Sequence, residues 1–261
     1  MPPAGKTVLD AFRLDGEVVL VTGAAKGLGF ATARALGQAG ATVVMTARSL
    51  DAAEESAAVL RNEGIFAHAR VLHVDDVEDV GRCIDDIEST IGFIDVLVNN
   101  AGLSIGNPAF DVTADQWRDV FATNVDGVWH CSRRVAQTMR ARGTGGRIVN
   151  IGSISAQIVN RPRWQPAYLS SKAAAHQLTK ALAAEWAPYG IRVNAVAPGY
   201  FLTDMSPVDQ PEYFHDCIEP TPLKRWGEPE ELGPLVVLLS SRASSFMTGS
   251  VVTIDGGYTL F

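Results

Sequence analysis

The chain has 261 residues, with 22 Lys and Arg against 29 Asp and Glu, and its formal net charge at pH 7 is −7. This composition is that of an ordinary globular protein, and a chain of this length can bury both faces of a parallel sheet. The acidic balance, without a block of basic residues, argues against nucleic acid or an anionic membrane surface as a partner. Any anionic ligand must therefore be held by local groups.

The sequence has no pattern typical of a signal peptide, a disulfide framework or a metal site. The start, Met1 to Leu14, has no apolar stretch of signal-peptide length, and no segment has the roughly 20 apolar residues that span a bilayer. Cys83, Cys131 and Cys217 lie far apart, which predicts reduced thiols rather than a disulfide framework or a zinc site. No local cluster has ligand spacing for a metal. We expect a cytoplasmic protein.

Seven short apolar runs rich in β-branched residues alternate with longer helical patterns. Strands that are apolar throughout and separated by helices predict a parallel sheet covered on both faces. The pattern is that of an α/β fold, a doubly wound sandwich. The predicted strands are Val18 to Val21, Thr42 to Thr46, Ala69 to Val74, Val96 to Val98, Arg147 to Ile151, Arg192 to Ala197 and Val251 to Ile254.

No linker or repeat interrupts this alternation, which predicts one domain over residues 1–261. The exception is a proline-rich stretch without strong periodicity at about residues 200–228. Long irregular segments inside compact domains tend to be lids or binding loops. We interpret this stretch as a small substrate lid, with a plain surface excursion as the alternative.

A glycine-rich turn follows the first predicted strand. Gly23, Gly27 and Gly29 lie in it, and a helical pattern follows from Phe30 to Ala39. Glycines let backbone N–H groups approach a phosphate at the positive end of a helix. The spacing Gly-x-x-x-Gly-x-Gly departs from the usual dinucleotide fingerprint. Taken alone, the turn is therefore also compatible with a purely structural role.

Four motifs together resemble those of the classical short-chain dehydrogenase/reductase family: Thr22 to Gly29, Asn99 to Gly102, Tyr168-x-x-x-Lys172 and Pro198-Gly199. The resemblance runs from about Leu14 to Thr259. It implies a single-domain Rossmann-type fold, a central seven-stranded parallel sheet and a nicotinamide dinucleotide. The cofactor-binding residues it implies are Gly23, Lys26, Gly27, Leu28, Gly29, Arg48, Asp76, Asn100, Ala101, Gly102, Tyr168, Lys172, Pro198, Gly199 and Thr203.

The end of the second strand bears on the choice between NAD and NADP. A carboxylate there would bind the adenosine ribose and repel a 2′-phosphate, whereas a cation would attract that phosphate. The chain has Ala47 and Arg48 at this place, and Lys26 in the glycine turn. These cations favour NADP(H), with NAD(H) as the alternative. In the family, Asp76 corresponds to a residue that contacts adenine; a helix N-cap is its other interpretation.

Tyr168 and Lys172 are four residues apart in a helical pattern, so both project from one helix face. A neighbouring ammonium and an oxidised nicotinamide would both favour the Tyr168 phenolate. Tyr168 would then exchange the proton of the substrate oxygen while a hydride is exchanged with the nicotinamide. Ser153 and Ser155 are both candidates for the serine that orients the substrate. We choose Ser153 because its register after the strand matches the family.

The resemblance also assigns Asn124 as a fourth catalytic residue. In the family, a helical distortion there lets its backbone carbonyl hold a water that links Lys172 to solvent. Several segments resemble bacterial polyol dehydrogenases of the galactitol type, which implies a sugar alcohol or related secondary alcohol as substrate. The alternatives are a 3-oxoacyl-thioester reductase and a non-catalytic dinucleotide-sensing regulator. The expected substrate contacts are Leu103, Ser153, Ser155, Gln157, Trp164, Tyr168 and Phe201.

Family resemblance further implies a homotetramer. The alanine-rich helical patterns Val120 to Arg142 and Ala167 to Trp186 would form one interface, and the apolar end Val251 to Phe261 the other. Packing of these helices on their own sheet alone is the alternative. Whether a cation binds at such an interface is not decided by the sequence.

Overall fold

The computed structural model describes residues 7–261. Seven parallel strands form one sheet in the order β3-β2-β1-β4-β5-β6-β7, which confirms the predicted sheet. Chain order reverses between β1 and β4, the place where an open α/β sheet has its binding crevice. The strands are β1 (Val18–Val21), β2 (Thr42–Ala47), β3 (Ala67–Val71), β4 (Ile94–Asn99), β5 (Gly146–Ile151), β6 (Ile191–Pro198) and β7 (Val251–Ile254).

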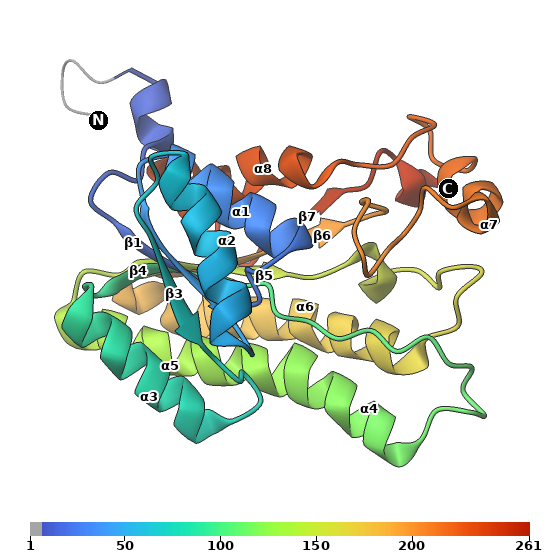
Figure 1. Ribbon diagram of the computed structural model, residues 1–261, viewed down its shortest axis with the longest axis horizontal. Coiled ribbons are helices and arrows are strands. Elements are labelled where there is room, and N and C mark those ends of the chain that lie inside the picture. Colours follow the sequence, from blue (N-terminus) through green and yellow to red (C-terminus); the bar gives the residue numbers. More distant parts are fainter. Residues whose placement is uncertain (1–6) are drawn as a thin grey trace.

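Helices cover both faces of the sheet (Figure 1). One face carries α1 (Gly27–Gln38), α2 (Leu50–Asn62) and α8 (Gly233–Ser240). The other carries α3 (Val77–Thr90), α5 (Gly127–Arg142) and α6 (Pro166–Trp186). The remaining helices are α4 (Ala114–Phe121), which leads into α5, and the short α7 (Pro211–Tyr213). No helix within residues 7–261 is both long enough and apolar enough to cross a membrane.

Alternation along β1 explains why the strands are apolar throughout. Val19 and Val21 pack into the core beneath α1, α2 and α8. Val18 and Leu20 pack into the core beneath α3, α5 and α6. Successive strand residues point to opposite faces, so a sheet covered twice needs an apolar residue at every position.

The third strand lies earlier than predicted, at Ala67–Val71 instead of Ala69 to Val74. Leu72 and Val74 are buried, yet both follow the strand. Val74 packs against the start of α5, where a Cβ on Gly127 would lie 2.7 Å from the Val74 Cγ2. The predicted strand ran too far because the apolar residues Leu72 and Val74, which follow β3, are also buried.

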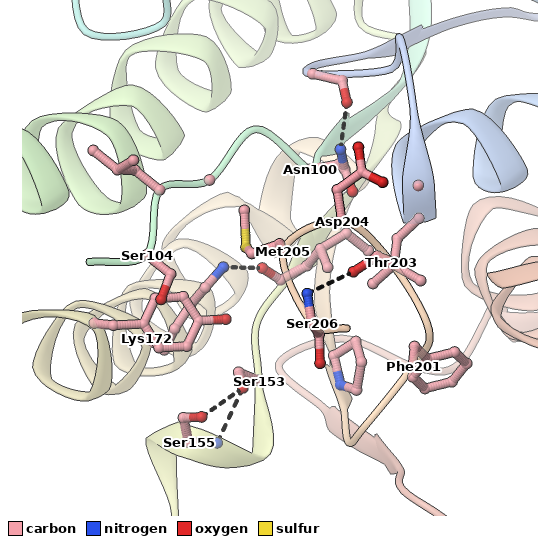
Figure 2. Close-up of a pocket in the computed structure, with 18 of the residues that line it drawn as sticks. Asn100, Ser104, Ser153, Ser155, Lys172, Phe201, Thr203, Asp204, Met205 and Ser206 are labelled. Carbon is pink, nitrogen blue, oxygen red and sulfur yellow. Dashed lines mark hydrogen bonds between the residues drawn. The ribbon is translucent and has the colours of Figure 1, made fainter. Parts of the chain in front are cut away.

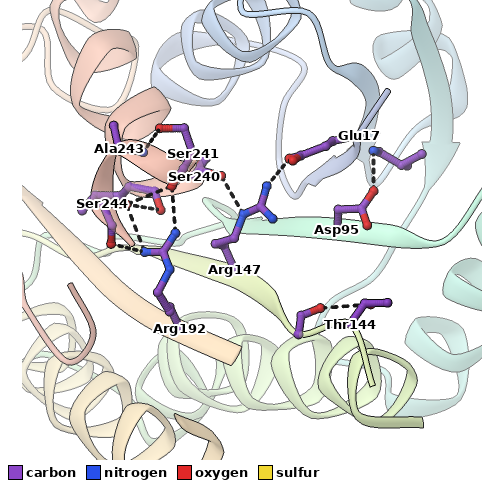
Figure 3. Close-up of polar contacts among 12 residues, drawn as sticks. Glu17, Asp95, Thr144, Arg147, Arg192, Ser240, Ser241, Ala243 and Ser244 are labelled. Carbon is purple, nitrogen blue, oxygen red and sulfur yellow. Dashed lines mark hydrogen bonds and ion pairs between the residues drawn. The ribbon is translucent and has the colours of Figure 1, made fainter. Parts of the chain in front are cut away.

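Two arginines tie the amino ends of β5 and β6 to the last residue of α8 and the segment after it (Figure 3). Arg147 is paired with Glu17, and its Nε donates to the Ser240 carbonyl at 2.8 Å. Arg192 donates to the backbone carbonyls of Ser241 and Ser244 at 2.9 and 2.8 Å. Burial lowers the pKa of Arg192 to about 10. This end of the sheet therefore has a structural role, opposite the carboxyl ends of the strands.

We expect Arg192→Met to lower the free energy of unfolding by about 3 kcal/mol, because several buried carbonyls lose their donor at about 1–3 kcal/mol each. Urea unfolding followed by circular dichroism measures this. Arg118→Met on α4 is the control, since Arg118 is exposed and, among residues 7–261, its side chain pairs only with Asp115 at the surface. Equal stabilities of the two variants would contradict the structural role of Arg192.

Candidate active site

A cleft of about 440 Å³ opens at the carboxyl ends of the strands. Figure 2 shows its polar side chains, with Lys172, Ser153 and Thr203 around the same space. Most residues predicted for the site line it. They are Gly23, Lys26, Gly27, Leu28, Gly29, Arg48, Asn100, Ala101, Gly102, Leu103, Ser153, Ser155, Tyr168, Lys172, Pro198, Gly199, Phe201 and Thr203.

The glycine turn after β1 brings the start of α1 to the cleft. Gly23 has φ +62°, and a Cβ there would lie 2.9 Å from the Ala101 Cα. On Gly29, a Cβ would lie 2.4 Å from the Gly23 carbonyl oxygen. Lys26, the N-cap of α1, caps no N–H group with its side chain, and the first turn contains no acidic residue. The first N–H groups of α1 are therefore suited to an anion.

Asn100 holds this turn against the end of β4 (Figure 2). Its Nδ2 donates to the carbonyls of Thr22 and Gly23 at 3.0 and 2.8 Å. In return the Thr22 Oγ1 accepts from the backbone N–H groups of Asn100 and Ala101, both at 3.0 Å. These bonds fix the floor of the cleft at the reversal point of the sheet.

A buried polar network supports the cleft from below. The Asn99 Nδ2 donates to the Asn150 Oδ1 at 2.8 Å and to the Ser132 Oγ at 2.9 Å. Asn150 donates in turn to the Thr179 Oγ1 at 2.9 Å. Because all four side chains are buried and bonded, the network locks β4, β5, α5 and α6 in one arrangement.

Tyr168 and Lys172 lie on one face of α6, as predicted. The Lys172 Nζ lies 5.6 Å from the centroid of the Tyr168 ring and donates to the Ile151 carbonyl at 2.8 Å. Lys172 is only 6% exposed, and no carboxylate within residues 7–261 forms an ion pair with it. Burial lowers the pKa of its ammonium to about 8.

In the protein alone, Tyr168 is not held as a phenolate. Burial raises the pKa of Tyr168, and a hydrogen bond with Ser153 opposes the rise. The expectation that the neighbouring ammonium favours the phenolate is therefore outweighed by burial. The lowering of this pKa by an oxidised nicotinamide stays a prediction.

Ser153 follows β5 in an extended conformation, with φ −170°. Its Oγ donates to the Ser155 Oγ at 3.0 Å and accepts from the Ser155 N–H at 3.1 Å (Figure 2). Both serines line the cleft, and the Ser153 hydroxyl is the one that lowers the pKa of Tyr168 against the effect of burial. The geometry favours Ser153 as the residue next to the reacting oxygen.

Known proteins resemble this chain over nearly its whole length. A family model described as enoyl-(acyl carrier protein) reductase matches residues 23–259. The chain belongs to the short-chain dehydrogenase/reductase family. It is 42% identical to the L-tagatose-forming galactitol 2-dehydrogenase of Cereibacter sphaeroides, covering 96% of this chain and 98% of the relative. It is 39% identical to the gluconate 5-dehydrogenase of Gluconobacter oxydans, with the same coverage.

A solved structure agrees with this fold. The crystal structure of a gluconate 5-dehydrogenase from Burkholderia cenocepacia, in complex with NADP and tartrate, superposes with a TM-score of 0.93. It shares 38% sequence identity, and the match covers 98% of this chain and all of that one. The prediction of a short-chain dehydrogenase/reductase with relatives among polyol dehydrogenases is confirmed.

Among the described residues 7–261, Asp76 is not one of those that line the cleft. Its carboxylate accepts from the N–H groups of Glu78 and Asp79 at 2.9 and 3.1 Å, and so caps α3. The neighbouring Asp75 lines the cleft instead. The structure therefore agrees with the alternative interpretation of Asp76 as a helix N-cap, and Asp75 is the carboxylate that faces the cleft.

Gln157 and Trp164 also lie outside the lining of the cleft, at least within the described part of the chain. Gln157 is exposed after a short 3-10 turn, and Trp164 is 52% exposed. The same loop sends Asn160 and Arg163 into the cleft instead. Position relative to a motif could not show which side chains of an irregular loop turn inward.

Asn124 lies in a π-helical turn, Ala122–Asp126, between α4 and α5. The helical pattern predicted from Val120 to Arg142 begins earlier, at Ala114, and contains this π-helical turn, so the distortion that the family implies at Asn124 is present. Asn124 does not line the cleft of the described chain; its side chain bonds both backbone groups of Leu103, at 2.8 and 2.9 Å, and the Ser171 Oγ at 3.0 Å. It fixes the loop after β4 on α6.

His176 is a site residue that sequence reasoning missed. It is buried one turn beyond Lys172, and its Nε2 lies 3.4 Å from the Ser153 backbone N–H. Burial lowers the pKa of His176 to about 4, so a neutral ring accepts this bond. A Cβ on Gly152 would lie 2.1 Å from the same nitrogen. The glycine before Ser153 thus leaves room for the ring that positions the serine.

At the rim of the cleft, Arg48 is exposed and forms no hydrogen bond or ion pair within residues 7–261. Lys26, by contrast, pairs with Asp204 at 2.8 Å. No carboxylate ends β2, where Ala47 stands. Among the described residues, no group of three His, Cys, Asp or Glu side chains could hold a metal ion.

Proposed function

We propose that this chain is an NADP(H)-linked oxidoreductase that reversibly converts a secondary hydroxyl of a polyol to a ketone. The observation that carries the proposal is the convergence of Ser153, Tyr168 and Lys172 in one cleft with the glycine turn. Relatives named for galactitol and gluconate support the substrate class. A purely sensing regulator would need none of these three side chains.

The residues of the cleft fit an anionic dinucleotide. The uncapped start of α1 suits the diphosphate, and Arg48 and Lys26 suit an adenosine 2′-phosphate. Asp75 takes the adenine-side place first assigned to Asp76. Pro198, Gly199 and Thr203 line the end nearer the reacting residues. When bound, NADP(H) supplies the acceptor or donor of the hydride.

Each reacting side chain has one proposed task. Ser153 donates to the substrate oxygen and orients it. Tyr168 takes the hydroxyl proton during oxidation and returns it during reduction. The buried Lys172 ammonium provides positive charge beside the ring and binds the cofactor ribose. The Asn124 carbonyl links Lys172 to solvent through a water.

Assembly and location are also part of the proposal. Trp117 and Trp129, on α4 and α5, are 39% exposed, and Leu260 and Phe261 are exposed at the chain end. Exposed apolar residues on these surfaces suit the interfaces of a homotetramer in the cytoplasm. We propose one domain over residues 1–261, with residues 200–228 as its lid. That segment has a small core of its own around Val208, Cys217 and Ile218.

An initial-rate assay at the nicotinamide absorbance tests the reaction. We expect turnover of hexitols, hexonates or their ketones with NADP(H). The same assay includes NAD(H) and acetoacetyl thioesters. Activity confined to the thioesters would establish a 3-oxoacyl-thioester reductase instead.

Arg48→Asp tests the cofactor preference. We expect the ratio of kcat/KM for NADP⁺ to that for NAD⁺ to fall about 100-fold, because the variant loses a charge-assisted bond to the phosphate and gains a repulsive carboxylate. Arg82→Asp makes the same charge change on the exposed surface of α3, outside the cleft lining, and serves as control. If both variants keep the wild-type ratio, Arg48 is not the phosphate partner.

A further inference from the structure

Arg163 lies where three loops meet at the substrate end of the cleft. Its guanidinium lies over the Tyr213 ring, 5.7 Å from the centroid, and its Nη1 donates to the Met205 carbonyl at 3.1 Å. Its Nε is 3.7 Å from the place of a Cβ on Gly106. A guanidinium has five N–H donors, and these contacts use one. Arg163 is exposed, and within residues 7–261 one of its donors bonds to the protein, so the others are free to meet solvent or a ligand.

No carboxylate of the described chain forms an ion pair with the Arg163 guanidinium. Within residues 7–261, neither Arg163 nor its neighbour Arg161 forms an ion pair, although both line the cleft. The carboxylates in the lining are Asp75, at the adenine side, and Asp204, which already pairs with Lys26. The substrate end therefore carries local positive charge in a chain whose net charge is −7. Such a place suits a carboxylate, which matches the fork of an arginine.

Asn160 adds an independent observation. It lines the cleft, is 4% exposed, and its Nδ2 donates to the Tyr200 hydroxyl at 3.1 Å. Its Oδ1 is buried without a hydrogen-bond partner in the described chain. An unpaired buried acceptor costs about 1–3 kcal/mol, which a hydroxyl of a ligand would recover. Asn160 therefore indicates a ligand with hydroxyl groups. It lies three residues before Arg163, which suits a carboxylate.

We infer that the substrate is a sugar acid, a polyhydroxy carboxylate, rather than a neutral sugar alcohol. Its carboxylate pairs with Arg163, one of its hydroxyls donates to Asn160, and the hydroxyl to be oxidised lies at Tyr168. This inference rests on the proposed function and leaves the reaction unchanged. NADP⁺, when bound, would supply the hydride acceptor, the O–H proton would pass to the Tyr168 phenolate, and the carboxylate would not react.

The test compares gluconate and galactonate with sorbitol and galactitol, using NADP⁺ and the full-length protein. We expect wild type to prefer the acids in kcat/KM. Arg163→Gln should lower kcat/KM for the acids by about 10- to 100-fold, mainly through KM, because a charge-assisted bond is lost. For the neutral polyols we expect a change of less than about 3-fold. Arg163→Lys should restore part of the loss, since it keeps the charge without the fork.

Arg140→Gln is the matched control. Arg140 is exposed on α5, and its guanidinium lies 4.5 Å from the centroid of the Tyr189 ring. Its replacement therefore also removes a cation from an aromatic face. Neither residue lines the cleft of the described chain. Thermal unfolding of each variant establishes that it is folded. A wild type that prefers neutral polyols, or an Arg163→Gln variant that loses both substrate classes equally, would overturn the inference while the proposed function stands. Absence of turnover with all four compounds would overturn both.

Discussion

Tyr168→Phe should lower kcat by about 10²- to 10⁴-fold in both directions, the range that general acid–base catalysis contributes. Phe keeps the ring, so the packing of α6 and the surface beside the cofactor stay nearly unchanged. The lost hydroxyl is the only part of this side chain that can exchange a proton. We therefore expect the dissociation constant of NADPH to stay within about 3-fold of wild type, since nearly all its contacts remain.

Fluorescence titration with NADPH and steady-state kinetics measure the two quantities on the same preparation. Ser153→Ala should also lower kcat, whereas Ser155→Ala, its neighbour in the same loop, should lower it less because Ser153, not Ser155, lowers the pKa of Tyr168. Wild-type oxidation should rise with pH, because burial raises the pKa of Tyr168 and the base must be deprotonated. A Tyr168→Phe variant with nearly wild-type kcat would remove Tyr168 from the chemistry.

Local signals in the sequence were sufficient for the sheet and for the cofactor end of the cleft. Strand β1 alternates between two cores, so its apolar run could be recognised without knowing its neighbours. Gly23 and Gly29 are required by close backbone approaches, which makes their spacing a local signature. The sheet was predicted correctly from such features, whereas the cofactor-binding role of the glycine turn stays a prediction.

Tertiary choices were harder to predict. Asp75 and Asp76 are equivalent in sequence, but only the second is placed to cap α3. Trp164 was expected in the cleft, yet the irregular loop turns Asn160 and Arg163 inward. His176 becomes important because Gly152, far from it in sequence, leaves room for its ring. Each of these outcomes depends on a contact between segments whose approach no local pattern reveals.

Lys172→Met should produce opposite effects on activity and on stability. We expect kcat to fall about 10²-fold or more, because the site loses the buried positive charge beside Tyr168. Stability should rise at pH 7. Burial lowers the Lys172 pKa from 10.5 to about 8. The charged form therefore destabilises the folded state by about 3 kcal/mol relative to the neutral amine. Methionine removes that penalty but leaves the Ile151 carbonyl without its donor, at about 1–2 kcal/mol.

The net gain of about 1–2 kcal/mol at pH 7 should depend on pH in a defined direction. Between about pH 8 and 10.5 the unfolded lysine holds a proton that the folded one has released, so wild-type stability rises relative to the variant. Above the unfolded pKa the penalty is gone, and only the lost hydrogen bond remains. Urea unfolding of both proteins at pH 7 and pH 9.5 should therefore show the gain shrinking. If the gain is constant with pH, the Lys172 ammonium does not destabilise the folded state. The idea that its charge is kept for catalysis at a cost in stability would then be wrong.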